Sequence, residues 1–251
     1  MAGLGAGAVQ DKPRSQKPYP VVHEIGRLWR YRVVRRTSRF SVVVTDGKSQ
    51  HTAHLTNSGR LRDLIFPGSV CLCIPKRPAK TTLRLVGVPV SEKWAVLVDP
   101  GEQSRAFVNA AQAGLIPWLA GWSITGSEVD CGESRIDLEI RSGGHTGYIE
   151  IKSAAMLIGD GTGSFPDCPT LRGRKHVGTL SRLAADHRCI ILFLVQHPDA
   201  VRFSPSVQGD PVFAAGISEA ARDGVEARAV KMCLDMDGRV VLVDPDLNCY
   251  V

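Results

Sequence analysis

The sequence lacks the features that mark several large classes of protein. No apolar run approaches the roughly 20 residues that a membrane-spanning helix needs, and the chain does not open with a basic segment followed by an apolar one. Its seven cysteines are odd in number and scattered, without a Cys-x-x-Cys pair, which argues against a disulfide framework and against a zinc site. These absences predict a cytoplasmic protein that has no membrane partner.

Nucleotide-binding loops of the common kinds are missing as well. The segment Gly159 to Gly163 is rich in glycine but lacks the lysine that a P-loop needs, and no dinucleotide-binding fingerprint occurs. The sequence therefore disfavours a metabolic enzyme that handles phosphate through such a loop.

Positive charge is abundant, and it is unevenly distributed. Residues 1–98 contain 17 Lys and Arg against 5 Asp and Glu, a balance of +12, whereas residues 99–251 contain 14 against 20, a balance of −6. A segment as basic as the first is typical of a polyanion-binding module. We expect DNA and/or RNA as the partner; the sequence points to no obligate protein partner and leaves the oligomeric state open.

Hydrophobic patterning divides the chain into three segments. Residues 1–24 are rich in Gly, Ala, Pro and Lys without periodicity and are predicted to be a flexible extension. Residues 25–98 contain short β-branched runs separated by turn signals, a spacing that favours a small β-barrel of the oligonucleotide-binding (OB) type. The strands predicted for this barrel segment are Leu28 to Thr37, Arg39 to Thr45, Gln50 to Leu55, Ser69 to Ile74, Thr82 to Val88 and Trp94 to Val98.

The third segment, residues 99–251, alternates strand and helix signals. Ser134 to Ile140 and Tyr148 to Lys152 predict two antiparallel strands, and Cys189 to Val195 is an apolar run typical of a strand covered on both faces. Helices are predicted from Arg105 to about Ala113 with Ser104 as cap, from about Leu171 to Asp186, and after the capping pair Asp210-Pro211. This order predicts a mixed-sheet α/β domain of the restriction-endonuclease type, and hence an α/β protein of mixed α+β character with an OB-like barrel at its N-terminal end.

The two antiparallel strands bring acidic groups and a lysine onto one face. Asp137 and Glu150 are predicted to hold Mg²⁺ or Mn²⁺, and the carbonyl of Ile151 to add a ligand. Lys152 points the same way as Glu150 and is predicted to orient the attacking water or to neutralise developing charge. An Asp followed by Glu-x-Lys is the signature of PD-(D/E)xK nucleases, although Ile136 stands where that name has proline.

Four residues near this face have two interpretations each. Glu128 either supplies a further carboxylate or is solvated, and Arg135 either contacts phosphate or pairs with a nearby carboxylate. Lys175 and His176, at the start of a predicted helix, either bind backbone phosphate or face water.

Several basic and polar residues are predicted to bind nucleic acid. In the barrel, arginines surround Trp29, Tyr31 and Phe40, a mixture suited to tracking a backbone while stacking bases, although each residue alone also suits a structural role. The predicted contacts are Arg30, Arg32, Arg35, Arg36, Arg39, Asn57, Arg172, Lys175 and His176.

Six separated blocks in one order resemble the sugar fermentation stimulation protein A family. They are Asn57-Ser58-Gly59, Ser134 to Asp137, Tyr148 to Ser153, Phe165-Pro166-Asp167, Arg172-Gly173 with Lys175-His176, and Arg202 to Pro205. The resemblance implies an OB-like barrel joined to a restriction-endonuclease-like domain, with Asp137, Glu150 and Lys152 on the family's active-site positions. Departures from the family pattern occur at Thr56, Cys131 and Leu171.

Two functions remain open. The first is a divalent-metal-dependent nuclease, and the alternative is a non-catalytic, largely sequence-nonspecific DNA-binding regulatory protein. Retention of Asp137, Glu150 and Lys152 favours cleavage, because carboxylates beside a polyanion weaken binding and serve no purpose in a protein that only binds.

Overall fold

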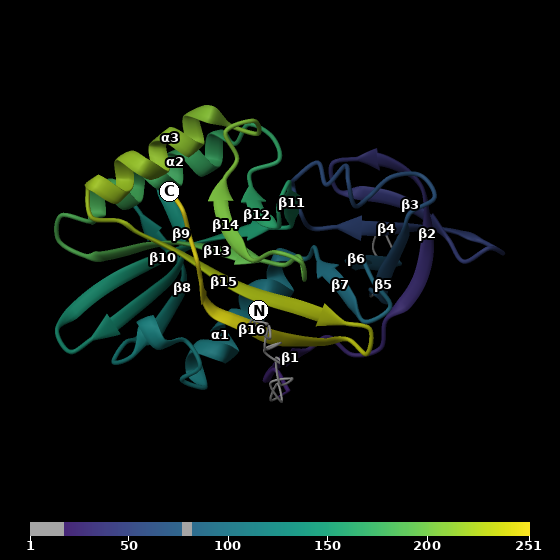
Figure 1. Cartoon of the computed structure of the whole chain (residues 1–251), viewed down its shortest axis with the longest axis horizontal. Helices are drawn as coiled ribbons and strands as arrows, with labels where there is room; N and C mark the ends of the chain where they lie inside the picture. The colour runs from purple at the N-terminus through teal and green to yellow at the C-terminus, as the bar shows by residue number, and fades with distance from the viewer. Residues whose placement is uncertain (1–17, 77–81) are drawn as a thin grey trace, which may run out of the picture.

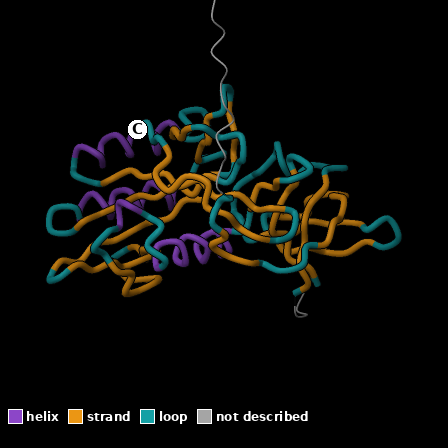
Figure 2. Tube along the Cα trace, turned by 60° about the horizontal axis from the view of Figure 1, so that its bottom comes forward, coloured by secondary structure: helices purple, strands orange, loops and turns teal. Residues whose placement is uncertain are grey.

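The computed structural model describes residues 18–76 and 82–251. Figure 1 shows a β-barrel at one end of the molecule and a sheet covered by helices at the other. Figure 2 shows that the helices belong to the second part, whereas strands and loops build the barrel. The first strands are β1 (Val21–Glu24), β2 (Trp29–Ser38), β3 (Ser41–Thr45), β4 (Gln50–Leu55), β5 (Val70–Pro75), β6 (Leu83–Pro89) and β7 (Trp94–Leu97).

Five of these strands close the barrel. β2 pairs antiparallel with β3 and β5, β3 with β4, and β5 with β6, while β4 pairs parallel with β6. Each barrel strand therefore has at least two neighbours, which closes the sheet on itself. Alternate residues such as Val42, Val44 and Ala53 are fully buried inside. The prediction of an OB-type barrel is confirmed.

The second part has a mixed sheet and a separate three-stranded sheet. Its elements are α1 (Pro100–Gln112), η1 (Pro117–Leu119), β8 (Ser123–Cys131), β9 (Ser134–Ser142), β10 (His145–Ala154), β11 (Met156–Ile158), β12 (Thr162–Phe165), α2 (Leu171–Leu183), β13 (Arg188–Val195), β14 (Arg202–Pro205), α3 (Pro211–Arg222), β15 (Glu226–Asp235) and β16 (Arg239–Leu247). β11, β12 and β14 form the three-stranded sheet. In the mixed sheet, β10, β13 and β15 run parallel, and β8, β9 and β16 are antiparallel to their neighbours. The predicted mixed α/β class is confirmed.

Helices cover both faces of the mixed sheet. α2 and α3 lie side by side over one face, and α1 lies on the other (Figure 1). Phe193, Val177 and Phe213 belong to the core under α2 and α3, while Leu192 and Phe107 belong to the core next to α1. The apolar run of β13 is buried on both faces, as its sequence predicted.

Backbone pairing joins the barrel to the second part. β7 pairs with β6 of the barrel and also with β15 of the helix-covered sheet, so one sheet continues across the boundary near Asp99. At the other end of the chain, β1 pairs with β16.

The N-terminal extension predicted for residues 1–24 needs a correction. Residues 1–17 lie outside the described part, but Val21–Glu24 form strand β1 rather than a flexible segment. Val22 is buried, and its carbonyl accepts a hydrogen bond from Asn109 Nδ2 at 2.9 Å. The sequence could not reveal this strand, because it has only four residues and its partner lies more than 200 residues away.

The start of α1 also differs from the prediction. The cap is Asp99, whose Oδ1 accepts hydrogen bonds from the backbone N–H of Gly101 (2.9 Å) and Glu102 (3.2 Å). Pro100 occupies the first helical position, where its missing N–H costs no hydrogen bond. Asp99-Pro100-Gly101 thus forms the start of the helix. The helix predicted after Asp210-Pro211 begins at its expected cap, Asp210, and the helix predicted from about Leu171 is capped by Thr170.

No helix within residues 18–76 and 82–251 combines the length and the apolar character needed to cross a membrane.

Candidate metal centre

The candidate centre lies where β9 separates from β10. Paired residues run from His145 opposite Ser142 to Ile149 opposite Leu138, and the pairing ends there. Leu138 packs in the core next to α1, whereas Ile136 packs in the core under α2 and α3. Asp137 lies between them, at the point where the backbone ladder with β10 stops.

The Asp137 carboxylate replaces the lost backbone partner. Its Oδ2 accepts a hydrogen bond of 2.6 Å from the backbone N–H of Ile151. The N–H and C=O of one strand residue point toward the same edge, so the Ile151 carbonyl also faces the gap beside Asp137. The predicted ligands Asp137 and Ile151 are therefore neighbours in space.

Glu150 and Lys152 form a buried cluster with His176 of α2. Their exposed fractions are 2%, 8% and 4%. Lys152 Nζ donates to Glu150 Oε1 at 2.6 Å, and His176 Nδ1 contacts the same oxygen. An ionised carboxylate only accepts, so we assign the proton to Nδ1; Arg172 Nε then donates to Nε2 at 3.3 Å. The helix and the strand thus hold one carboxylate oxygen in place.

The second oxygen of Glu150 has no partner. Glu150 Oε2 is buried and receives no hydrogen bond from the described residues. A buried carboxylate oxygen without a partner is energetically unfavourable, and a cation near it relieves that penalty. This oxygen is the feature of the cluster that best fits a bound cation.

Electrostatics distinguishes the two carboxylates. Burial raises the pKa of Asp137 to about 6, and the neighbouring charge on Glu150 adds to the rise. Burial also favours the neutral form of Glu150, but the charge of Lys152 and the hydrogen bond from His176 outweigh it and lower the pKa of this carboxyl. The pair concentrates negative potential in a site that water reaches poorly.

The donor set fits a hard divalent cation. Two carboxylates and a backbone carbonyl are oxygen donors, and Mg²⁺ commonly takes few protein ligands and completes its shell with water and phosphate. Within residues 18–76 and 82–251, no three His, Cys, Asp or Glu side chains gather as a metal-binding group. The cluster therefore offers an ion two side-chain carboxylates and one backbone carbonyl.

Glu128 lies opposite Asp137 on β8. Its neighbours Ser127 and Val129 pair with Leu138 and Ile136, and its φ of 54° is in the left-handed region that non-glycine residues seldom adopt. Arg135 Nε donates to Glu128 Oε2 at 2.7 Å, and both side chains are 57% exposed. Of the two interpretations offered for Arg135, the structure shows the one in which it pairs with a carboxylate.

Three predicted nucleic-acid contacts turn out to be internal. Asn57 is 7% exposed, donates to Ser153 Oγ at 3.2 Å, and so ties the barrel to β10. His176 belongs to the cluster around Glu150. Arg36 donates to the backbone carbonyls of Arg39 (2.7 Å), Gly59 (2.9 Å) and Arg60. Burial or internal hydrogen bonding gives these side chains structural tasks, which a sequence pattern cannot distinguish from surface contacts.

The remaining predicted contacts are at the surface. The Lys175 side chain is half exposed, and its Nζ lies 3.5 Å from Glu133 Oε2. The other exposed residues of this group are Arg30, Arg32, Arg35, Arg39 and Arg172.

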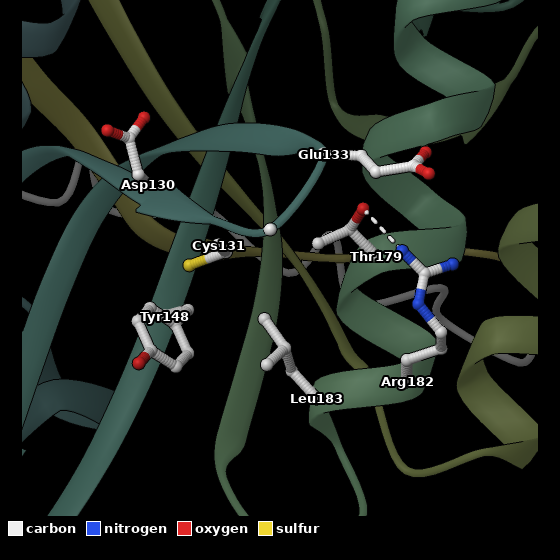
Figure 3. Close-up of a pocket in the computed structure, with 8 residues that line it drawn as sticks. Asp130, Cys131, Glu133, Tyr148, Thr179, Arg182 and Leu183 are labelled. Atoms are coloured by element: carbon white, nitrogen blue, oxygen red, sulfur yellow. Dashed lines mark hydrogen bonds between the residues drawn. The ribbon is translucent and has the colours of Figure 1, made fainter.

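A hollow adjoins the cluster on the same side of β10. Figure 3 shows it between the β8–β9 turn and α2, with Tyr148 and Leu183 on its wall and Arg182 hydrogen-bonded to Thr179. Its volume is about 520 Å³. Its lining has two carboxylates, Asp130 and Glu133, against one arginine, so it does not extend a cationic surface toward the metal centre.

These features define a class: an OB-type barrel joined to a restriction-endonuclease-like domain with a two-carboxylate and lysine cluster. Comparison with known families agrees. The domain described as "SfsA N-terminal OB domain" matches residues 34–97, and the "Sugar fermentation stimulation protein RE domain" matches residues 101–238. The chain belongs to the sugar fermentation stimulation protein family, as its sequence blocks predicted.

Individual relatives cover most of the chain. Proteins described as "Sugar fermentation stimulation protein homolog" are 33% identical over 219 residues in Pyrococcus furiosus and 35% identical over 221 residues in Archaeoglobus fulgidus. These alignments cover 87% and 88% of this chain, and 94% of each relative. A solved structure, described as Pyrococcus furiosus SfsA in complex with Ca²⁺, has a TM-score of 0.88 and 32% identity and covers 92% of this chain and 100% of its own.

Proposed function

We propose that this protein is a divalent-metal-dependent nuclease that hydrolyses phosphodiester bonds in DNA and/or RNA. The observation that carries the proposal is the buried Glu150, which has one oxygen fixed by Lys152 and His176 and the other without a partner, beside Asp137. A two-carboxylate site with an adjacent amine is suited to stabilising charge as it develops on a phosphate.

Each residue of the cluster has a distinct task in this proposal. Asp137, Glu150 and the Ile151 carbonyl would hold Mg²⁺ or Mn²⁺, and the bound ion supplies charge neutralisation and an acidified water. Lys152, held 2.6 Å from Glu150 Oε1, places its ammonium where it can orient the attacking water or offset charge on the phosphate. His176 fixes the orientation of Glu150, and Arg172 fixes that of His176.

A relative supports the choice of ion class. The solved Pyrococcus furiosus protein was described in complex with Ca²⁺, which prefers oxygen ligands as Mg²⁺ does. That likeness favours a divalent cation at an oxygen-rich site in this chain.

In this proposal, the barrel binds the nucleic acid. Arg30, Arg32, Arg35 and Arg39 are exposed, and none forms an ion pair within the described residues. Such charges displace counterions from a phosphate backbone, and binding should therefore weaken steeply with salt.

One observation favours the alternative, a non-catalytic DNA-binding regulatory protein. Glu150 Oε1 already interacts with Lys152 and His176, so part of the cluster is satisfied by protein groups alone. In that case Lys152 would neutralise a structural carboxylate, and the barrel would bind DNA without cleavage.

A cleavage assay separates the two. Labelled single- and double-stranded DNA and RNA are incubated with the purified protein in Mg²⁺, Mn²⁺ or EDTA, alongside Glu150→Gln. We expect products with metal and none with EDTA or with the variant. Binding without products in every metal would favour the regulatory protein, and cleavage that persists in EDTA or in the variant would exclude this site as its source.

A further inference from the structure

The barrel loop from Asn57 to Leu61 lies between β10, which carries Glu150 and Lys152, and the segment that leads into α2. At one end, Asn57 Nδ2 donates to Ser153, the residue after Lys152. At the other, the backbone N–H of Leu61 donates to Asp167 Oδ2 at 2.7 Å, three residues before the α2 cap Thr170. Two hydrogen bonds thus fix this loop beside the candidate metal centre.

The backbone of this loop packs closely against Asp167, which restricts the residues and conformations that fit there. A Cβ at Gly59 would lie 3.1 Å from both carboxylate oxygens of Asp167, which is tighter than ordinary contact. Leu61 is buried and has a φ of 48°, a left-handed conformation that a leucine adopts only where its surroundings enforce it. The conformation of Arg60, between these two residues, is therefore set by the joint.

Arg36 fixes a second segment to the same place. Its guanidinium donates to the carbonyls of Gly59 and Arg60 in the loop and to the carbonyl of Arg39 at the β2–β3 turn. One side chain therefore binds the backbone of two exposed arginines at once. Burial lowers the pKa of Arg36, and the charge of Asp167 opposes this effect.

Arg39 and Arg60 lie where the barrel meets the segment that leads into α2. Burial and the charge of Asp167 raise the pKa of the Cys168 thiol, and the charges of Arg60 and Arg39 oppose the rise. Arg36 holds the backbone of both arginines, so the two side chains start from the same place at the joint. Within the described residues, neither arginine forms an ion pair. Asp167, the acidic residue next to Cys168, accepts a hydrogen bond from the backbone N–H of Leu61.

We propose that Arg39 and Arg60 form a phosphate clamp at the joint of the two parts and guide a polynucleotide backbone from the barrel into the candidate metal centre. Arg36, Asn57 and Asp167 are positioning residues that hold the clamp in place. The clamp rests on the proposed function, and it narrows that function to one path: the backbone that the arginines of β2 bind continues across the joint toward the candidate metal centre.

The test is an anisotropy titration of a labelled oligonucleotide in EDTA at several salt concentrations. Arg39→Ala and Arg60→Ala should each weaken binding about fivefold to tenfold and lower the salt slope by about one, since each removes one phosphate contact. The control is Arg222→Ala at the end of α3. Arg222 lies just before β15, and the far end of that ten-residue strand pairs with β7 beside the barrel. A strand of this length spans about 30 Å, so Arg222 is far from the clamp and its replacement should leave affinity unaltered.

A double-mutant cycle tests the positioning role of Arg36. Arg36→Gln should weaken binding in the wild-type background but have no further effect in Arg39→Ala/Arg60→Ala, because it acts through those two residues. An equal effect in both backgrounds would overturn the positioning role.

The outcomes also separate the clamp from the proposed function. If wild type binds, and Arg30→Ala, Arg32→Ala and Arg35→Ala weaken binding while Arg39→Ala and Arg60→Ala do not, the clamp is wrong and nucleic-acid binding stands. If wild type binds no polynucleotide at low salt, both proposals fall.

Discussion

The two halves of this chain use their arginines in different ways. In the second half, most basic side chains are bound to carboxylates: Arg105, Arg135, Arg141, Lys152, Arg174, Lys175, Arg188, Arg202, Arg228 and Arg239. Within residues 18–76 and 82–98, Arg84 is the one Lys or Arg in an ion pair, and its partners Asp99 and Glu102 belong to the second half.

This difference shows that pairing, rather than number, decides where charge is available. A paired arginine offers little net field to a phosphate, whereas an unpaired exposed one keeps its field and its counterions. The barrel therefore keeps its surface charge available, and the second half has the buried carboxylates. The four predictions below test this division, from the largest expected effect to the smallest.

Replacing the lysine of the candidate centre should have the largest effect. We expect Lys152→Met to lower the rate of metal-dependent cleavage about 100-fold or more, because it removes a group that stabilises developing charge. Affinity for the uncleaved oligonucleotide in EDTA should change little, since Lys152 is buried against Glu150. The control is Lys93→Met, an exposed lysine over Trp94 on the β6–β7 turn. An equal loss of cleavage in both variants would contradict the assignment.

Neutralising unpaired barrel arginines should have the next largest effect. Arg30→Ala/Arg32→Ala/Arg35→Ala should weaken binding about 100-fold at low salt and reduce the salt slope by about three. Anisotropy titrations at several salt concentrations measure both.

The matched control for that variant removes three paired arginines. Arg141, Arg202 and Arg239 each lie against a carboxylate, so their triple alanine variant should bind with nearly unchanged affinity. If the two triple variants lose the same amount of affinity, ion pairing does not decide which arginines are available to bind phosphate.

Arg84 is the paired arginine of the barrel, and we expect that breaking its network with Glu102 has a moderate effect on stability. Burial would raise the pKa of Glu102, but hydrogen bonds from Arg105 and His23 and the charges of Arg105 and Arg84 lower it from 4.5 to about 2. We expect Glu102→Gln to reduce the free energy of unfolding by about 2 kcal/mol at pH 7. Urea unfolding of both proteins measures this difference.

The pH dependence of that difference has a fixed sign. The depressed pKa means that Glu102 contributes its stability above about 4.5 and loses it as the pH falls toward about 2. The gap between wild type and Glu102→Gln should therefore narrow below pH 4.5. A gap that widens in acid would show that the network does not hold an ionised Glu102.

The smallest effect is expected at the exposed pair Arg135–Glu128. Both side chains are 57% exposed, and pairs of this kind contribute about 0–1 kcal/mol to stability. Arg135→Ala should therefore leave the urea midpoint nearly unchanged. A loss above about 2 kcal/mol would mean that the pair supports the left-handed conformation of Glu128 and, through it, the centre.

Much of the fold follows from local signals in the sequence. Period-two alternation fixed the faces of β9 and β10, and turn residues separated the barrel strands, so both features could be predicted. Strand pairing between distant segments could not. β1 with β16 and β7 with β15 depend on backbone hydrogen bonds that leave no mark on residue type.

The candidate site was predictable in its core and not in its surroundings. Asp137, Glu150 and Lys152 stand on predicted strands with a recognisable spacing. His176 had a usable signal, because it lies four residues before the buried Leu180 on the apolar side of α2. The internal role of Arg36 had none, since a guanidinium bound to carbonyl oxygens looks in sequence like one facing phosphate.

The most direct test of the division between the halves measures binding and cleavage on one oligonucleotide with two variants. Affinity is titrated in EDTA, and single-turnover cleavage is followed in Mg²⁺ or Mn²⁺ at saturating protein. We predict that Lys152→Met keeps its affinity and loses its rate, while Arg30→Ala/Arg32→Ala/Arg35→Ala loses affinity and keeps its rate at saturation. If both variants lose affinity and rate together, binding and hydrolysis do not reside in separate halves of the chain.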